Sequence, residues 1–189
     1  MPNFTQVYID YLPPKTKNMK SKTPSQSITI NTEVVLPNDT NNIGNLFGGK
    51  LMQWVDITAA IAAQRHCGHV VVTAAINQVS FDKPIKQTSI VTLEAKISRA
   101  FATSMEIFVD VFVEDTRTGE KTKCNEAILT FVAIDENGKP LPVPPIEPQT
   151  EVEKKRFDSA LRRRQLSLIL GGRMKPDDAT ELKALFYKD

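Results

Sequence analysis

The stretch Leu36–His69, LPNDTNNIGNLFGGKLMQWVDITAAIAAQRHCGH, decides the fold, because a polar, glycine-rich loop runs straight into a long helical pattern. The pattern extends from about Gly48 to His66, and Gly68 is a natural stop. Such a helix spans about 27 Å at about 1.5 Å per residue. Four small side chains allow a sheet to approach closely: Ala59, Ala60, Ala62 and Ala63. Four large side chains fill volume in the core: Leu51, Trp54, Ile57 and Ile61.

Strand-like alternation flanks this helix. One run precedes it and four follow, with turn residues between them: residues 27–36, 69–81, 89–100, 104–115 and 122–135. In the run that starts at Ser104, apolar side chains at every second position mark one buried face: Met105, Ile107, Val109, Val111 and Val113. The order of one strand, one helix and four strands in a meander predicts an α+β domain, with an antiparallel sheet around one central helix.

The rest of the chain divides by composition. Residues 1–26 mix Pro, Lys, Ser and Thr and predict a flexible arm, ahead of a globular domain at residues 27–137. Residues 138–148, GKPLPVPPIEP, predict an extended, semi-rigid spacer that leaves the domain. Residues 149–189 predict a helical tail with an excess of Lys and Arg.

Composition and short motifs exclude several classes of protein. No run approaches the roughly 20 apolar residues of a membrane span, and the N-terminus lacks the apolar core of a secretory signal. Two cysteines are too few for a disulfide framework, so we expect a cytoplasmic protein. The cluster of His66, Cys67 and His69 lacks a fourth zinc ligand and indicates a helix end with a buried cysteine. We expect no metal, and no nucleic-acid partner because acids interrupt the basic tail.

Asp56 is the main candidate for a catalytic residue, because it is an acid in the middle of an otherwise apolar helix. Its neighbours one turn away, Met52, Gln53, Ala59 and Ala60, include no Lys or Arg. A carboxylate shielded from water there holds a proton more tightly, which makes it a better general base near neutral pH. The alternative is a solvated acid on the exposed face of the helix.

The start of the helix offers groups that can stabilise negative charge. Gly48 and Gly49 lie at the positive end of the helix dipole, with unpaired backbone N–H groups and no side chain to block a carbonyl oxygen. The alternative is that these glycines serve only a tight loop and close packing against the sheet.

Asn41, 15 residues before Asp56, is a further candidate in the loop. Its amide can hold a water or a carbonyl group without titrating. Its alternative role is an Asx-turn, which is the commoner use of asparagine in loops. Asp39, Asn42 and Asn45 compete with it for either role.

Two segments, NDTNNIGNLFGGKLMQWVDITAAIAAQRHC and VVTAAINQVSFDKPI, together resemble the acyl-coenzyme A thioesterase branch of the hotdog superfamily. The resemblance covers about residues 27–135, and the Arg-rich tail is also similar to that branch. It implies the hotdog fold and hydrolysis of acyl-CoA to a free fatty or other carboxylic acid and CoA. It also implies homodimers with shared active sites, grouped into hexamers. No cofactor is implied, because CoA is part of the substrate.

The resemblance assigns roles residue by residue. The family's loop asparagine falls on Asn41, its helix acid on Asp56, and its backbone N–H groups on Gly48 and Gly49. In relatives the asparagine and the acid meet across the dimer interface. Many relatives carry His just before the glycine pair, whereas this chain has Phe47, which cannot hydrogen-bond. Whether Asp56 acts as general base or as nucleophile stays open.

CoA contacts in the family commonly come from the turn between the strands expected at residues 89–100 and 104–115. This places them on Ser98, Arg99, Thr103 and Ser104. In the tail, three arginines can reach the nucleotide phosphates: Arg162, Arg163 and Arg164. The alternative for the tail is a solvated amphipathic helix that packs on a neighbouring subunit.

Two other functions compete with thioester hydrolysis. One is a protein of the same fold that binds acyl-CoA without cleaving it, as a sensor does. The other is a hydratase, which generally needs a His–acid pair near the helix. Only His66 and His69 are present in the chain, and both lie at the far end of the helix.

Overall fold

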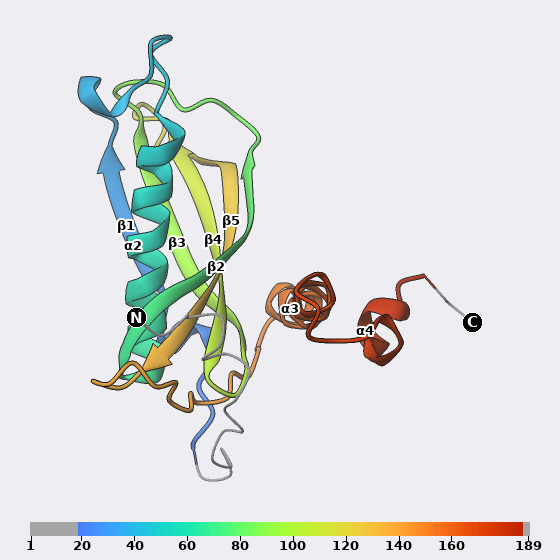
Figure 1. The fold of residues 1–189 in the computed structure, drawn as a ribbon. Coiled ribbons are helices and arrows are strands. Elements are labelled where there is room, and N and C mark those ends of the chain that lie inside the picture. Colours follow the sequence, from blue (N-terminus) through green and yellow to red (C-terminus); the bar gives the residue numbers. More distant parts are fainter. Residues whose placement is uncertain (1–18, 187–189) are drawn as a thin grey trace.

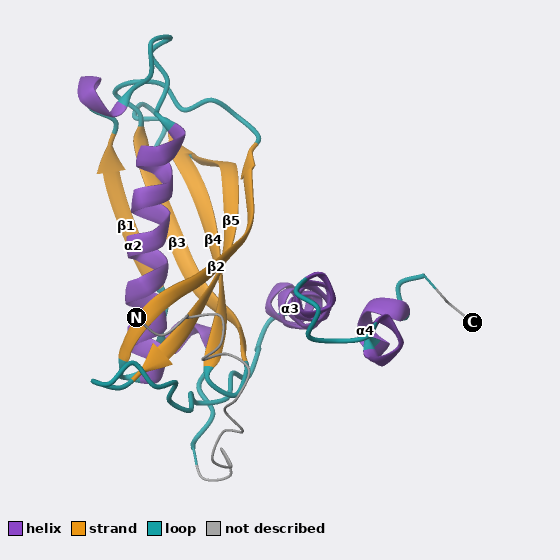
Figure 2. Ribbon diagram, in the orientation of Figure 1, coloured by secondary structure: helices purple, strands orange, loops and turns teal. Residues whose placement is uncertain are grey.

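The computed structural model describes residues 19–186, and its centre is a five-stranded antiparallel sheet wrapped around helix α2 (Figures 1 and 2). The strands are β1 (Thr29–Val34), β2 (Val70–Phe81), β3 (Ile90–Ala100), β4 (Ser104–Glu114) and β5 (Lys121–Ile134). The helices are α2 (Gly48–Cys67), α3 (Glu151–Leu170) and α4 (Thr180–Lys183). The predicted central helix and all five predicted strands are confirmed, with ends that agree within two residues.

The strand order is β1-β3-β4-β5-β2, so the predicted meander of four strands is wrong for β2. Strands β3, β4 and β5 do form a meander, but β2 pairs with β5 at the far edge of the sheet. The reason is the segment between β2 and β3, which does not make a tight hairpin. It crosses the start of α2 instead, where Leu46 N–H donates to the Ile85 carbonyl and Gln87 N–H donates to the Gly44 carbonyl.

The core lies between α2 and the concave face of the sheet. The predicted inward face of β4 is confirmed, since Met105, Ile107, Val109 and Val111 are fully buried. On α2 the predicted burial of Leu51 and Trp54 is confirmed, but that of Ile57 and Ile61 is wrong in the single chain. These two side chains are 48% and 38% exposed. They share a stripe of the helix with Arg65, which bonds to residues at the start of β1, so they lie on the side of α2 away from β2.

The proline-rich segment is extended, as predicted, but it does not leave the domain. Val143 and Ile146 are buried in the same core as α2, and Leu141 N–H donates to the Ala133 carbonyl at the end of β5. The segment also forms a short bridge with Lys22, so part of the predicted N-terminal arm is packed against it. Residues 1–18 of that arm lie outside the described residues.

Helix α3 lies on the opposite side of the sheet from α2 (Figure 1). Its start is fixed by a capping box in which Thr150 accepts from Glu153 N–H and the Glu153 carboxylate accepts from Thr150 N–H. Helix α3 confirms the prediction that the tail is basic and helical. Among the residues that the structure describes, no helix is both long enough and apolar enough to cross a membrane.

Two ion pairs attach α3 to the convex face of β4. Arg163 makes two hydrogen bonds, at 3.0 and 2.7 Å, to the carboxylate of Glu106, which is 3% exposed. Arg156 pairs with Asp110 in the same two-pronged way. Burial alone would raise the pKa of Asp110, but hydrogen bonds from Arg156 and Lys123 outweigh it and hold that pKa below its ordinary value. These pairs use cations of the tail to hold the helix on the sheet.

His66 is fully buried near the end of α2, beneath the proline-rich segment. Its Nε2–H donates to the Pro144 carbonyl at 2.8 Å, while Nδ1 has no hydrogen-bond partner within residues 19–186. Burial lowers the pKa of His66, the hydrogen bond to Pro144 partly offsets this, and the charge of Lys22 lowers it further. The fold therefore holds His66 in its neutral form.

We expect His66 to make the fold less stable in mild acid. Because its pKa is lower in the folded than in the unfolded state, its contribution is complete above about pH 6.5 and is lost as the pH falls below that value. One proton gives a slope of at most about 1.4 kcal/mol per pH unit. Between roughly pH 8 and 5, the melting temperature should fall less for His66→Gln than for the wild-type protein. The glutamine side chain keeps a donor for the Pro144 carbonyl. The control is His69→Gln, at the exposed histidine. Equal pH dependence in all three proteins would contradict the prediction.

Candidate active site

Asp56 lies on α2 beside strand β2, and it is half-buried. The hydroxyl of Thr73, on β2, donates to Asp56 Oδ1 at 2.8 Å. This bond fixes the orientation of the carboxylate and leaves Oδ2 to accept a proton. Because β2 is the last strand of the sheet, one chain shields the carboxylate on one side only. The expected shielding of Asp56 from water is therefore only partly provided by a single copy.

The start of α2 presents bare backbone N–H groups. Phe47 is the N-cap residue and makes no side-chain cap, and no described residue accepts a hydrogen bond from Gly48 N–H or Gly49 N–H. A Cβ atom added to Gly49 would lie 2.5 Å from the Phe47 ring, so only glycine fits beneath that ring as it stands. Two orphan donors at the positive end of a helix dipole suit an oxygen that gains negative charge.

Asn41 closes the loop in front of α2 and lines a cavity there. Its Oδ1 accepts from the backbone N–H groups of Ile43 and Asn45, each at 3.1 Å. Asn41 therefore forms the Asx-turn that the sequence offered as its alternative role. Its Nδ2 donor stays available for a ligand. The cavity is also lined by Asn45 and Gly48. Asp39 does not compete, because its carboxylate accepts from Leu36 N–H and pairs with Lys50 at 3.2 Å.

Asp56 and the glycines of the same helix are too far apart to act on one bond. Asp56 follows Gly49 by seven positions in the helix, which is about 10 Å along the axis. A general base and an oxyanion site must both lie about 3 Å from the reacting atoms. A single chain therefore holds two halves of a site, one at the start of α2 and one at its middle.

Thr73 was missed by the sequence reasoning, which assigned it only to a strand. The available signal was a polar side chain in the apolar run VVTAA, on a strand that follows the helix with Asp56. We expect Thr73→Val to lower kcat about tenfold or more, because Asp56 loses the hydrogen bond that orients it. Thr73→Ser should recover most of the rate, whereas an equal loss in both variants would point to packing. Steady-state kinetics with thermal melts separates the two cases.

The residues expected to bind CoA are partly engaged within the chain. Ser98 is buried and donates to the Glu106 carboxylate at 2.7 Å, and Ser104 is buried as well. Arg99 donates to the backbone carbonyl of Phe157, and its guanidinium carbon lies 3.9 Å from the centre of the Phe157 ring. Thr103 is half-buried in the turn between β3 and β4, and its carbonyl accepts from Ala133 N–H. A role for these residues in CoA binding stays a prediction.

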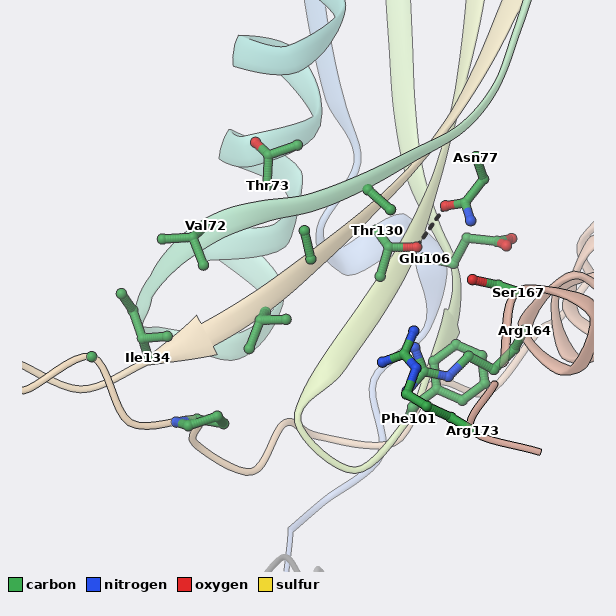
Figure 3. A pocket seen from close by; sticks show the side chains of 15 residues that line it. Val72, Thr73, Asn77, Phe101, Glu106, Thr130, Ile134, Arg164, Ser167 and Arg173 are labelled. Carbon is green, nitrogen blue, oxygen red and sulfur yellow. Dashed lines mark hydrogen bonds between the residues drawn. The ribbon is translucent and has the colours of Figure 1, made fainter. Parts of the chain in front are cut away.

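The arginines of α3 have separate positions. Arg163 is bound to Glu106, and Arg162 is half-buried on the helix. Arg164 lies 5.4 Å from the centre of the Phe101 ring. It lines a cavity of about 300 Å³ between α3 and the convex face of the sheet, together with Arg173, which sequence reasoning did not single out (Figure 3).

Polar and aromatic groups line the part of this cavity next to α3, and apolar side chains of β2 and β5 line much of the rest. Thr130 donates to Asn77 Oδ1 at 2.7 Å, and Glu106, Ser167 and Phe101 complete the side nearest the arginines (Figure 3). Two guanidinium groups, one aromatic ring and several hydrogen-bonding groups suit an anionic ligand with a flat ring. No three His, Cys, Asp or Glu side chains come close enough to hold a metal ion in the part of the chain that the structure describes.

Known proteins resemble this chain in sequence and in structure. Residues 43–120 match the Thioesterase superfamily. The chain is 46% identical over 138 residues to the uncharacterized acyl-CoA thioester hydrolase YkhA of Bacillus subtilis, which covers 73% of this chain and 80% of that protein. A solved apo-hexameric acyl-CoA thioesterase matches with a TM-score of 0.74 and 42% identity, over 77% of this chain and 94% of that one.

A Staphylococcus aureus acyl-CoA hydrolase, solved with butyryl-CoA, CoA and CoA disulfide, matches with a TM-score of 0.75 and 36% identity. The match covers 87% of this chain and 99% of that one. That hydrolase has also been solved with alanine in place of one Asn, one Asp or one Thr. There the Asn precedes the Asp by 15 residues and the Thr follows it by 17, which are the spacings of Asn41, Asp56 and Thr73 here.

The superfamily match covers α2 and strands β2, β3 and β4, and it includes Gly48, Gly49 and Asp56; Asn41 lies two residues before it. The identity to the Bacillus subtilis protein extends over four fifths of that protein. On this sequence and structural similarity, the chain belongs to the acyl-CoA thioester hydrolases of the hotdog-fold thioesterase superfamily.

Proposed function

We propose that this protein hydrolyses the thioester bond of acyl-CoA to give a free carboxylic acid and CoA. The observation that carries the proposal is the pair of half-sites on α2. Asp56 is oriented by Thr73 in the middle of the helix, and uncapped N–H groups lie at its start. The relatives named as acyl-CoA hydrolases, one of them solved with butyryl-CoA, support this substrate class.

In the proposed reaction the thioester carbonyl oxygen lies against the N–H groups of Gly48 and Gly49. Asp56 takes a proton from a water, and the water oxygen attacks the carbonyl carbon. The negative charge that forms on the carbonyl oxygen is stabilised by the two N–H groups and the helix dipole. The C–S bond then breaks, CoA leaves as its thiolate, and the proton returns from Asp56 to sulfur. Direct attack by Asp56, through an anhydride, remains the alternative first step.

The two half-sites come together in a dimer. Strand β2 offers an unpaired edge and carries exposed apolar side chains that a partner would cover: Val70, Ile76 and Phe81. Antiparallel pairing of two β2 edges places the start of one α2 near the middle of the other. Solved relatives described as hexameric support further assembly of such dimers.

We assign the nucleotide part of CoA to the cavity between α3 and the sheet. Its guanidinium groups, on Arg164 and Arg173, suit phosphates, and the Phe101 ring suits a base. Within the tail, Arg163 and Arg156 hold α3 on the chain's own sheet, while Arg164 lines the cavity. Packing of α3 on a neighbouring subunit, the alternative considered from the sequence, stays a prediction.

The test is an assay of the purified protein with acyl-CoAs from acetyl to palmitoyl and a thiol reagent. Free CoA should appear in proportion to enzyme with at least one of them. A protein that binds acyl-CoA with micromolar affinity but releases no thiol would be the non-hydrolytic sensor instead. Comparing calorimetric binding with thiol release separates these two functions.

A further inference from the structure

A second cavity, of about 290 Å³, lies beneath the first turn of α2. Three buried apolar side chains line it: Leu46, Leu51 and Ile85. Gly48 and Phe81 line it too, and both are more exposed, so they mark its open side. The cavity therefore starts at the N–H groups where the thioester carbonyl is proposed to lie, and it extends into the core.

Asn125 is the buried polar group in this cavity. It lies on β5 with its side chain on the same face as Ala127 and Leu129, which pack in the core, and it is 2% exposed. Its Oδ1 is fully buried and has no hydrogen-bond partner within residues 19–186. Such atoms are uncommon in folded proteins, because a buried carbonyl oxygen without a donor has lost its water and gained nothing in return.

We propose that Asn125 selects the acyl group, and that the preferred substrates carry a hydroxyl group that donates to Asn125 Oδ1. The inference rests on the proposed function. With the carbonyl oxygen at the start of α2 and CoA outside, the acyl group enters the cavity. A plain hydrocarbon chain has no donor and leaves Oδ1 unpaired. A hydroxyl on the chain satisfies it.

The chemistry of the walls narrows the choice of acyl group. Oδ1 is an acceptor, so it favours a donor such as a hydroxyl over a carboxylate. The volume is at the small end of the roughly 300–1,000 Å³ range of small-molecule pockets, which indicates a short chain. A site with a buried hydrogen-bonding group discriminates strongly against an analogue that lacks the matching group. Lys83 also lines the cavity but is exposed.

The experiment measures kcat/KM for hexanoyl-CoA and for its isomers with a hydroxyl at successive carbons. At least one hydroxylated isomer should be hydrolysed about tenfold or more faster than hexanoyl-CoA by the wild-type protein. Asn125→Leu, which is similar in size and apolar, should bring this ratio to about one or below. Asn125→Ala should abolish the preference as well, and it serves if the leucine variant does not fold.

The control is Thr92→Val, which removes a buried hydroxyl from β3 on the other face of the sheet, where it pairs with Thr32. This variant should keep the wild-type ratio. Equal rates for all isomers, or a ratio that survives in both Asn125 variants, would overturn the inference but not the proposed function. If succinyl-CoA were hydrolysed faster than the hydroxylated isomers, and Lys83→Ala abolished this, the inference would be overturned, because Lys83 would then select the acyl group. Failure to hydrolyse any acyl-CoA would overturn both.

Discussion

We expect that replacing Asp56 with alanine will lower kcat/KM for acyl-CoA by about a hundredfold or more and leave the fold intact. The size of the loss follows from the rate contribution of a positioned general base, which is typically about 10²- to 10⁴-fold. The fold is expected to survive because Asp56 is half-buried and, within residues 19–186, its side chain makes one hydrogen bond, to Thr73. The measurement is thiol release under kcat/KM conditions, with circular dichroism to confirm that the variant is folded.

A matched control lies one turn away on the same helix. Gln53 is exposed, and Gln53→Ala should keep near wild-type turnover. Asp56→Asn keeps the shape of the side chain but cannot accept the proton, so it should be as slow as the alanine variant. An asparagine variant with near-normal turnover would show that Asp56 is not the base. After a single turnover in ¹⁸O-labelled water, label recovered in Asp56 itself identifies it as the nucleophile, because water that attacks the aspartyl carbon of the anhydride leaves its oxygen there.

Much of the fold was predictable because its signals are local. The period of the apolar residues defines α2 and the five strands, and Gly68 ends the helix with a positive φ of 74°. The position of β2 was not predictable in this way, since its pairing with β5 depends on how residues 82–89 cross the start of α2. That crossing is made by backbone hydrogen bonds from residues far apart in the sequence, such as Leu46 to Ile85.

The candidate site was only half predictable for a similar reason. Asp56 is conspicuous in sequence as a lone acid in an apolar helix, and Gly48 and Gly49 stand out at the helix start. Thr73 and Asn125 are not conspicuous, because one polar residue in a strand is ordinary. Their importance comes from what they face: a carboxylate in one case and a cavity in the other. Such relations across the core arise from packing, which a single sequence does not display.

Ile76→Lys should separate the protein into monomers that are about a hundredfold or more less active. Ile76 lies on the edge strand β2 and is 54% exposed in the single chain. In the proposed dimer it is covered, and burying an unpaired ammonium group there costs several kcal/mol. The matched control is Ile30→Lys on β1, at the opposite edge, where the side chain is 58% exposed. Light scattering should show that the dimer persists in this control, and the control should remain active.

Activity would be lost on dissociation either because each site is shared between two chains or because a complete site in one chain needs the dimer to hold its shape. A mixing experiment separates these two causes. If each site takes Asp56 from one chain and Asn41 from its partner, a dimer of Asp56→Ala with Asn41→Ala contains one intact site and one doubly defective site. Co-expression in equal amounts should then restore about a quarter of wild-type activity, since half of the dimers are mixed and half of their sites are intact. Were each chain's site complete by itself, the mixture would be no more active than its parents, and the shared site would be wrong. Recovery of activity would mean that the two half-sites, which lie about 10 Å apart on α2 of one chain, meet across the β2 edge of the dimer.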